Sequence, residues 1–416
     1  MESQALRDRV RASVAANVPS LSPSSRVVIA VSGGGDSVAT AALLRDAGIV
    51  DPSRTLVAHF DHRLRTQEAA ARDRTAVDPL CRRYGFELIT GVWEAPRPGE
   101  AHARDARYRF LAGVAHDHAA TVVVTGHTAD DQAETVLMRM MRGAGLHGLR
   151  GMAPEAPYPV GAASGLTLAR PLLCATRAET RAYCRAAGLP FSDDETNADT
   201  SLLRNRVRLE IIPAMERGAP GARERLLAVA DESRDAVAAL DAIAGTALRA
   251  SDDGHVHLDR AALRAMPRGV VPYAYRLAVT RLLGDARELD RRHYARLAAA
   301  AHGRTGAEIE LPRGIVVTVD PSEVIVSVGR LVAPAIGPSI ELPLPYSGDL
   351  GAWRVDVVRA DAAALVRAAM PASRIPTSAS VLQLPPTAVL RARRAGDRVP
   401  ALHKKLQDAY VDAKVP

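Results

Sequence analysis

The chain has 416 residues, 47% of them hydrophobic and 24% charged, with a formal net charge of +7. Its length exceeds that of one typical core, so we expect two or three domains. No run of about 18 apolar residues occurs, which argues against a membrane-spanning helix. The polar N-terminus has no signal-peptide core, so the predicted location is the cytoplasm.

Cysteine content and charge narrow the function classes further. Cys81, Cys174 and Cys184 are odd in number and have no C-x-x-C spacing. We therefore expect buried thiols rather than a disulfide framework or a zinc ribbon. Lysine occurs only at positions 404, 405 and 414, so the positive charge comes almost wholly from arginine. A basic chain is typical of a protein with a polyanionic partner such as nucleic acid.

Strands and helices alternate along the first third of the chain. In order, the patterns predict a helix at 3–16, a strand at 26–31, helix 38–45, strand 54–62, helix 67–84, strand 86–92, helix 100–118 and strand 121–127. Such alternation is typical of parallel βαβ units, so we predict an α/β fold with a doubly wound parallel sheet. Ligands in such sheets bind beyond the carboxyl ends of the strands.

A glycine-rich loop follows the first of these strands. Its residues are Ser32, Gly33, Gly34, Gly35, Asp36 and Ser37. Three glycines allow positive φ and close approach of backbone N–H groups, and the helix start that follows favours an anion. The P-loop of kinases is excluded because its lysine is missing, since no lysine precedes Lys404. An ordinary glycine-rich turn is the alternative.

Polar residues follow two of the predicted strands. His59, Asp61 and His62 end the second strand, and Gly126 and His127 end the fourth. Carboxyl ends of parallel strands meet at one edge, so we expect these groups to converge near the glycine loop. A lone histidine at such a position is more often a structural hydrogen-bonding group.

An amphipathic helix is predicted to begin within His127–Thr135 and to continue through Met141, Arg142 and Gly143. Asp130, Asp131 and Glu134 share one face, which we expect to point outward. The apolar face, expected to dock, contains Ala133, Val136, Leu137 and Met140. Three carboxylates so close together repel one another unless a cation compensates them, so the pattern favours a metal or ammonium site. Acids that merely suit the helix dipole are the alternative.

The next segment, Gly143-Ala144-Gly145-Leu146-His147-Gly148, matches G-x-G-x-x-G. It follows a helix instead of a strand, so it fails the structural requirement of a dinucleotide-binding fingerprint. We interpret it as a helix stop with a basic loop that contains Arg142 and Arg150.

A set of motifs between residues 32 and 208 resembles the tRNA(Ile)-lysidine synthetase family. These motifs are Ser32 to Ser37, Asp61 to Arg65, Ala103 to Tyr108, His127 to Thr135, Leu137 to Gly143, Arg170 to Leu173 and Arg204 to Arg208. The Ser-Gly-Gly-x-Asp-Ser motif alone resembles only the PP-loop of the wider ATP pyrophosphatase superfamily. The set in this order is far more restrictive.

The resemblance implies a reaction and its cofactors. ATP would adenylate the wobble cytidine of the isoleucine tRNA with the CAU anticodon, and free L-lysine would displace AMP at C2 to give lysidine. The implied cofactors are ATP and Mg²⁺. The implied ATP-binding residues are Ser32, Gly33, Gly34, Gly35, Asp36, Ser37, His59 and Gly126, with Asp36 also holding Mg²⁺. The implied lysine-binding residues are Asp131, Glu134 and Arg107, and the implied catalytic residues are Asp36, His127 and Arg107.

The resemblance also implies contacts with tRNA. We expect them at Arg142, Arg204, Arg206, Arg208, Lys404 and Lys405. Arginines spaced by two, as at 204–208, equally fit one solvated strand face, and the basic tail equally fits a solvated helix. The oligomeric state stays open, with a homodimer as one alternative.

The second half of the chain changes in character. It predicts a long helical stretch at 216–249, a short strand at 255–258, a helix at 272–284, and a small hairpin from 306–319 that closes near Val328. The predicted domains are a catalytic PP-loop domain at 1–215, a mainly helical substrate-binding domain at 216–331 and, after a linker at 332–338, a small α+β tRNA-binding domain at 339–416. Family members usually continue beyond the position of Pro416, so we expect this last domain to be short or truncated.

Two other functions stay open. A PP-loop tRNA thiolase needs catalytic or cluster-binding cysteines, and the cysteine spacing argues against it. A nucleotide-binding protein that binds RNA without catalysis is the second alternative, against which Asp36 and the acidic helix face argue.

Overall fold

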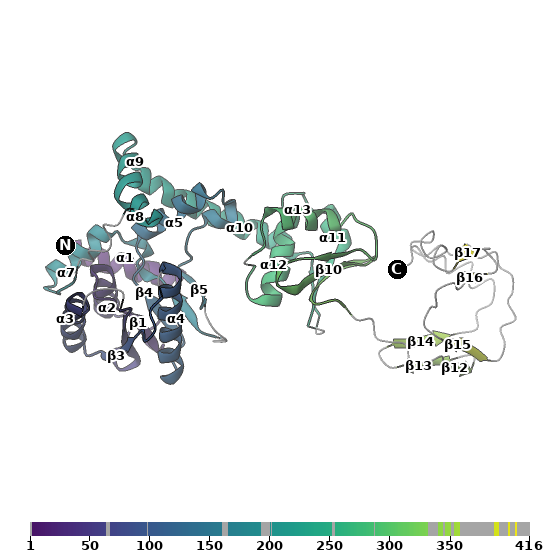
Figure 1. The fold of residues 1–416 in the computed structure, drawn as a ribbon, viewed down its shortest axis with the longest axis horizontal. Helices are drawn as coiled ribbons and strands as arrows, with labels where there is room; N and C mark the ends of the chain where they lie inside the picture. The colour runs from purple at the N-terminus through teal and green to yellow at the C-terminus, as the bar shows by residue number, and fades with distance from the viewer. Residues whose placement is uncertain are drawn as a thin grey trace. The chain divides into compact units, whose positions relative to one another are not determined.

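The computed structural model describes residues 2–63, 67–97, 99–159, 165–192, 200, 202–251, 254–286 and 288–331, and short strands beyond residue 339. The chain forms two compact units, Met1–Val237 and Ala238–Pro416 (Figure 1). None of the helices in the described ranges combines the length and the apolar composition that crossing a bilayer requires.

A six-stranded sheet organises the N-terminal unit, with the order β3-β2-β1-β4-β6-β5. Its strands are β1 (Val27–Ala30), β2 (Thr55–Asp61), β3 (Glu87–Val92), β4 (Val122–Thr125), β5 (Glu155–Pro157) and β6 (Thr167–Ala169). Neighbouring strands are parallel except for β5, which pairs antiparallel with β6. The predicted doubly wound parallel sheet is confirmed.

Helices cover both faces of this sheet. The helical segments up to Gly218 are α1 (Glu2–Asn17), α2 (Gly35–Asp46), α3 (Gln67–Tyr84), α4 (Glu100–Asp117), α5 (Ala129–Met141), α6 (Leu146–Leu149), α7 (Arg177–Ala186), α8 (Leu203–Arg206), the π-helical segment η4 (Val207–Ile211) and α9 (Ile212–Gly218), of which α8, η4 and α9 pack with α5 instead of the sheet. Figure 1 shows α2 and α3 on one side of the strands and α4 on the other.

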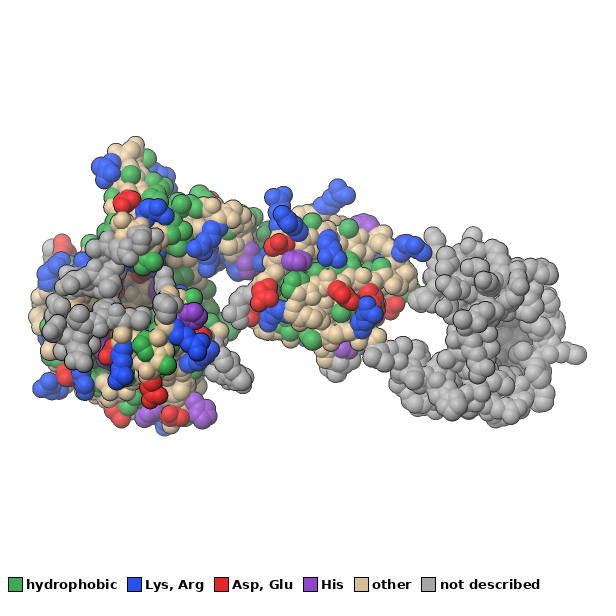
Figure 2. All heavy atoms as spheres, in the orientation of Figure 1, with side chains coloured by type: hydrophobic (Ala, Val, Ile, Leu, Met, Phe, Trp, Pro, Cys, Tyr) green, Lys and Arg blue, Asp and Glu red, His purple; other side chains and the backbone are tan. Residues whose placement is uncertain are grey.

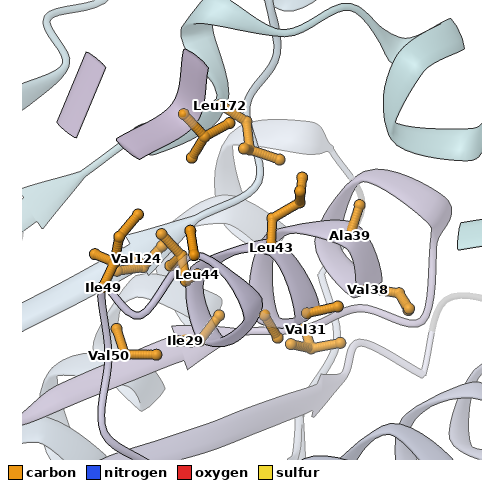
Figure 3. Packing of buried hydrophobic residues seen from close by; sticks show 14 of the residues in the cluster. Ile29, Val31, Val38, Ala39, Leu43, Leu44, Ile49, Val50, Val124 and Leu172 are labelled. Carbon is orange, nitrogen blue, oxygen red and sulfur yellow. The ribbon is translucent and has the colours of Figure 1, made fainter. Parts of the chain in front are cut away.

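Strand β1 is buried on both faces, as its unbroken apolar run predicts. Ile29 belongs to a core cluster with Leu43 and Leu44 of α2 (Figure 3). Val28, whose side chain alternates to the other face, belongs to a second cluster with Leu111 of α4. This double burial places the loop after β1 firmly in the middle of the sheet.

The sheet changes direction next to β1. The chain first builds β2 and β3 on one side of β1 and then adds β4 on the other. In doubly wound sheets, a change of direction of this kind marks where ligands bind, in a crevice outside the carboxyl ends of the two strands. Ser32 and the following glycines lie on one side of this crevice, and Gly126 and His127 on the other.

The predicted helix at 216–249 is wrong in one respect, because it is interrupted. Helix α9 ends at Gly218 and α10 (Ala222–Gly245) begins three residues after Ala219. Gly221 has a φ of 82°, which stops helical propagation. The carboxylate of Glu216 accepts hydrogen bonds from the backbone N–H groups of Gly221 (3.0 Å) and Arg223 (2.7 Å), so it caps the new helix.

The C-terminal unit contains more sheet than the predicted hairpin. Five antiparallel strands pair in the order β7-β8-β11-β10-β9. These strands are β7 (Leu248–Arg249), β8 (Val256–Asp259), β9 (Glu308–Glu310), β10 (Ile315–Val319) and β11 (Glu323–Val328). The helices packed with them are α11 (Arg260–Ala265), α12 (Val271–Leu283) and α13 (Arg291–Ala300). The predicted strand at 255–258 and the helix at 272–284 are confirmed.

Beyond residue 339 the structure describes only short strands. They are β12 (Ile340–Pro343), β13 (Tyr346–Leu350), β14 (Trp353–Val357), β15 (Thr387–Leu390), β16 (Arg398–Val399) and β17 (Lys404–Lys405). The predicted linker at 332–338 lies outside the described residues, as do the side chains of Lys404 and Lys405.

Candidate functional site

The glycine loop after β1 uses each glycine differently. Only Gly33 has a positive φ, of 94°. Gly34 is extended and is the N-cap of α2, and Gly35 is the first helical residue. A Cβ at Gly35 would lie 3.1 Å from Cγ of Arg181 and 3.2 Å from the ring of Phe191, so this glycine allows close packing. The three glycines therefore have different roles, and the positive φ expected of this loop occurs at Gly33.

Two serines fasten this loop to the start of α2. The hydroxyl of Ser37 accepts a hydrogen bond from the backbone N–H of Ser32 (3.1 Å) and donates one to the carbonyl of Gly34 (2.8 Å). The loop is therefore held in one conformation, with the positive end of α2 at the crevice. Such a preorganised helix N-terminus suits a phosphate group.

The loop after β4 packs directly against this helix start. A Cβ at Gly126 would lie 2.8 Å from the hydroxyl of Thr40 and 3.0 Å from the carbonyl of Asp36. On the other side, the Nδ1 atom of His59 lies 2.9 Å from the carbonyl oxygen of Val31. Gly126 and His59 therefore set the shape of the loop from its two flanking strands.

Asp36 contacts helix α7, and the sequence does not suggest this contact. Its carboxylate accepts hydrogen bonds from the hydroxyl of Thr180 (2.5 Å) and from Nε of Arg177 (3.2 Å), both on α7. Burial raises the pKa of Asp36, against the lowering effects of Thr180 and Arg177. Asp36 is thus a half-buried carboxylate with one immediate positive neighbour.

The carboxylates of α5 are buried, so the expected outward-facing acidic surface is wrong. Asp131 is 7% exposed and Glu134 only 1%. One oxygen of Asp131 accepts hydrogen bonds from the backbone N–H (2.9 Å) and hydroxyl (3.0 Å) of Thr128, which caps the helix. Met140, expected on the docking face, is 43% exposed.

Three arginines compensate these carboxylates. Arg208 contacts Glu134 through Nε (2.7 Å), and Arg204 contacts Glu134 through Nε (3.0 Å) and Asp131 through Nη2 (3.1 Å). Arg177 contacts Asp131 at 3.2 Å and Glu134 at 3.5 Å. The positive charge that compensates the acidic residues of α5 therefore comes from arginines of the chain itself. Among the residues with described positions, no group of three or more His, Cys, Asp or Glu side chains could hold a metal ion.

The segment that carries Arg204 and Arg208 is helical, so the strand-face alternative is wrong. Helix α8 continues into the π-helical segment η4, and these two arginines lie four residues apart on one side. Arg206 is exposed. The spacing of the arginines cannot distinguish a strand from a helix here. Arg204, Arg206 and Arg208 are two residues apart, as on one face of a strand, and Arg204 and Arg208 are also four residues apart, as on one side of a helix.

His127 lies among positive charges. Its Nδ1 is 2.9 Å from the hydroxyl of Thr125. Burial lowers the pKa of His127, Asp131 opposes this effect, and Arg170, Arg107 and Arg204 add to it. The imidazole is therefore neutral at neutral pH.

The guanidinium of Arg107 has no carboxylate partner among the described residues. Its Nε is buried and has no hydrogen-bond partner in the described part of the chain. Its guanidinium carbon lies 5.7 Å from the centre of the Tyr108 ring. Burial lowers the pKa of Arg107, and no carboxylate is among the groups that raise it.

Sequence reasoning missed Arg177 and Thr180. The only local signal is a capping box, in which Thr176 and Glu179 start helix α7. That pattern predicts a helix but not its neighbour, and Arg177 is separated from Asp36 by 141 positions.

The cysteines do not form a reactive group. Cys81 and Cys184 are buried, as predicted, and Cys174 is partly buried. Burial raises the pKa of Cys81 to about 11 and that of Cys184 to about 12, so both thiols stay protonated at neutral pH.

Comparison with known proteins decides the family. Residues 6–215 match the model of the PP-loop domain. The tRNA(Ile)-lysidine synthase of Symbiobacterium thermophilum is 37% identical to the chain, and the alignment covers 99% of the chain and 89% of that protein. The chain belongs to the tRNA(Ile)-lysidine synthase family.

Other members support the same assignment. The tRNA(Ile)-lysidine synthase of Geobacter sulfurreducens is 34% identical over 95% of the chain and 84% of its own length. That of Dehalococcoides mccartyi is 30% identical over 81% of the chain and 71% of its own length. As a member of this family, the chain is an enzyme with an ATP-using PP-loop domain.

Proposed function

We propose that the enzyme joins free L-lysine to C2 of the wobble cytidine in the isoleucine tRNA with the CAU anticodon. In the first step the C2 oxygen attacks the α-phosphate of ATP and pyrophosphate leaves. In the second, the ε-amino group of lysine attacks C2, loses a proton, and displaces AMP. The observation that carries the proposal is a PP-loop with Asp36 that shares one arginine, Arg177, with the carboxylate pair of α5.

ATP binding is assigned to the crevice between β1 and β4. The phosphates lie against the loop of Gly33 to Gly35 and the N-terminus of α2, where backbone donors and the helix dipole favour negative charge. Gly126 lets the opposite loop approach this site closely. The internal hydrogen bonds of Ser37 keep the loop in shape before ATP arrives.

The donor set fits one Mg²⁺ ion held partly by substrate. Mg²⁺ is commonly bound by one or two carboxylates together with substrate phosphates, and Asp36 supplies one carboxylate at the phosphate loop. Arg177 then retains Asp131 and Glu134 as partners. When bound, the ion neutralises charge on the leaving pyrophosphate.

Lysine binding is assigned to Asp131 and Glu134. A pair of buried carboxylates is a natural binding site for an ammonium group. In the described structure three guanidiniums occupy these oxygens, so lysine binds by exchanging with at least one of them. Arg107, with its unpartnered buried nitrogen, suits the lysine carboxylate or the reacting phosphate.

His127 contributes as a neutral group. Because its pKa is lowered, it adds no positive charge between the carboxylates and the reacting base. The ring follows β4 and lies next to the hydroxyl of Thr125, which supports a position near the proposed ATP site. We assign it to orienting the cytidine and the α-phosphate.

The proposal is tested by incorporation of labelled lysine into the isoleucine tRNA, with the methionine tRNA of the same anticodon as the specificity control. ATP-pyrophosphate exchange with the cognate tRNA reports the first step alone. Asp36→Asn should abolish exchange, whereas Asp117→Asn, an exposed change on α4, should leave it intact. Absence of exchange in the unmodified enzyme would refute the ligase assignment, and exchange without lysine incorporation would show that another nucleophile is used.

A further inference from the structure

Arg177 contacts both parts of the proposed active site. Its Nε donates to Oδ2 of Asp36 beside the phosphate loop (3.2 Å), and its Nη2 donates to Oδ1 of Asp131 (3.2 Å) and lies 3.5 Å from Oε1 of Glu134. One guanidinium therefore joins the loop assigned to ATP to the carboxylates assigned to lysine. On the visible face of the N-terminal unit basic side chains lie scattered at the surface (Figure 2), whereas the side chain of Arg177 is only 17% exposed.

The backbone of Arg177 is fixed, so a change of partners involves its side chain. The backbone N–H of Arg177 donates to Oδ2 of Asp130 on α5 (2.7 Å). Just before it, the carbonyl of Ala175 accepts a hydrogen bond from the N–H of Ala129 (2.8 Å). These two bonds tie the start of α7 to the start of α5. The long side chain of Arg177 has several rotatable bonds and can turn about this fixed point.

Arg177 holds the carboxylate pair less closely than the other two arginines do. Arg208 binds both oxygens of Glu134, at 2.7 Å and 3.1 Å. Arg204 binds Glu134 at 3.0 Å and Asp131 at 3.1 Å. The contacts of Arg177 with the pair are longer, at 3.2 Å and 3.5 Å. Since charge-assisted hydrogen bonds are strongest at about 2.7–2.9 Å, Arg177 is the easiest of the three guanidiniums to displace from the pair.

The two oxygens of Asp36 have different partners. Oδ1 accepts a hydrogen bond from the hydroxyl of Thr180 (2.5 Å), which is buried, whereas Oδ2 accepts one from Arg177. Thr180 therefore keeps Asp36 in place when Oδ2 changes its partner. A Mg²⁺ ion bound by Asp36 and ATP competes with Arg177 for Oδ2 and repels the guanidinium, since both are positive. Arg177 is then left with its two contacts to the carboxylate pair.

The phosphates of ATP offer Arg177 a replacement partner. They are assigned to the loop that carries Asp36, and guanidinium groups bind phosphate oxygens through charge-assisted hydrogen bonds. Mg²⁺ and ATP together thus remove one partner of Arg177 and supply another, away from Asp131 and Glu134. Displacement of Arg177 from the pair therefore costs less free energy when Mg²⁺ and ATP are bound.

We propose that Arg177 is a positioning residue that couples the two substrates, because Mg²⁺ and ATP at Asp36 weaken its attachment and the lysine ammonium then displaces it from Asp131 and Glu134. Before ATP binds, Arg177 competes with lysine for this pair, so lysine binds weakly. The inference rests on the proposed function, since it uses the assigned ATP and lysine sites. Coupling of this kind is reciprocal, so lysine strengthens the binding of ATP by the same factor.

The coupling is measured by equilibrium dialysis of labelled L-lysine against the full chain without tRNA, so that no reaction occurs. The nucleotide is an ATP analogue with a methylene bridge between the α- and β-phosphorus atoms. Addition of this analogue with Mg²⁺ should lower the lysine Kd by about 5- to 20-fold. Lysine should lower the Kd of the analogue by the same factor.

Variants of Arg177 show whether this residue carries the coupling. Arg177→Gln should bind lysine without nucleotide about as tightly as the unmodified chain does with it, and the analogue should change its lysine Kd by less than about 2-fold. Arg185→Gln, the same change at an exposed position of α7, is the matched control and should retain the full coupling.

A conservative variant keeps the positive charge. In Arg177→Lys one compact ammonium group cannot bind Asp36 and the carboxylate pair together, so the coupling should fall to less than about half of its original factor. Circular dichroism and thermal unfolding verify that each variant is folded. If Arg177→Gln does not fold, Arg177→Lys decides the question alone.

An unchanged lysine Kd when the analogue and Mg²⁺ are added to the unmodified chain would overturn the inference. Full coupling in the folded Arg177 variants would also overturn it, because attraction between bound phosphates and the ammonium would then link the two sites without this residue. Absence of lysine binding under every condition would overturn it as well, whereas incorporation of labelled lysine into the tRNA would still support the proposed function.

Discussion

At the scale of single residues, the main feature of the site is a buried pair of carboxylates whose arginine partners would be exchanged for the proposed lysine ammonium. Asp131 and Glu134 are saturated by Arg177, Arg204 and Arg208, and buried charges of this kind are stable only as long as every partner is present. The proposed lysine ammonium competes for the same oxygens. Burial raises the pKa of Asp131, but the charges of Arg177 and Arg204 outweigh this effect and hold the pKa at about 2. Lysine at the proposed site therefore has to displace a guanidinium.

Replacement of Glu134 separates these two roles. Glu134→Gln should reduce the free energy of unfolding by about 3 kcal/mol, because it removes one of the two buried carboxylates that Arg177, Arg204 and Arg208 share. It should also raise the lysine KM well above any change in ATP KM. Urea denaturation and steady-state kinetics measure the two effects.

The companion variant is Arg208→Gln, alone and combined with Glu134→Gln. The double variant should be less destabilised than the sum of the single ones by about 0.5–3 kcal/mol, as expected for residues in one network. Additive losses in stability would show that the two side chains do not interact, and an unchanged lysine KM in Glu134→Gln would contradict the lysine-site assignment.

The sequence predicts the carboxylates of this site better than it predicts the arginines that contact them. Asp131 and Glu134 are recognisable from their motif and their position after a strand. Their burial is not, because acids in a first helical turn ordinarily face solvent. Arg204 and Arg208 are separated from Glu134 by 70 and 74 positions, and no local pattern can indicate a contact over such a distance.

At the scale of elements, the site depends on two loops that diverge from neighbouring strands. Apolar runs such as Arg26–Val31 predict buried parallel strands reliably, so the crevice could be placed from sequence. The break between α9 and α10 could not, because it depends on Glu216 capping a helix that starts six residues later. The π-helical segment η4 has no sequence signature of its own.

Gly126 tests the contact between the two loops. Gly126→Ala would bring a methyl group to 2.8 Å from Thr40 and 3.0 Å from backbone atoms of Asp36 and Ser37. The start of α2 must then shift, which should cost about 1–3 kcal/mol of unfolding free energy and raise the ATP KM. Thermal unfolding and ATP-pyrophosphate exchange measure these outcomes.

Gly113→Ala on α4 is the matched control. No atom lies within 4 Å of its added methyl group, and alanine favours helix interiors by about 0.5–1 kcal/mol over glycine. This variant should therefore be slightly more stable, with an unchanged ATP KM. Equal behaviour of the two variants would mean that the approach of the β4 loop to α2 is unimportant for ATP binding.

At the scale of the whole molecule, buried titratable groups limit the range of pH in which the N-terminal unit is stable. His127 has a lowered pKa, so it is neutral in the folded unit at pH values where the unfolded chain binds a proton. Cys81 and Cys184 have raised pKa values, so they keep protons at pH values where the unfolded chain loses them. The first effect destabilises the folded unit at acid pH and the second at alkaline pH, and neither acts near neutral pH.

The clearer prediction concerns the acid limb of the stability profile, which is the fall of the unfolding free energy below about pH 6.5. As the pH falls below 6.5, the usual pKa of histidine, the unfolding free energy should drop by up to about 1.4 kcal/mol per pH unit, because only the unfolded chain takes up the proton at His127. Asp36, whose pKa is raised by burial, acts in the opposite direction, so a comparison of variants is needed. His127→Gln should flatten the acid limb between about pH 5 and 6.5, whereas His116→Gln, an exposed change on α4, should leave it as steep as before. Urea denaturation at a series of pH values measures the slopes, and an unchanged acid limb in His127→Gln would show that this imidazole is protonated equally in the folded and unfolded chains.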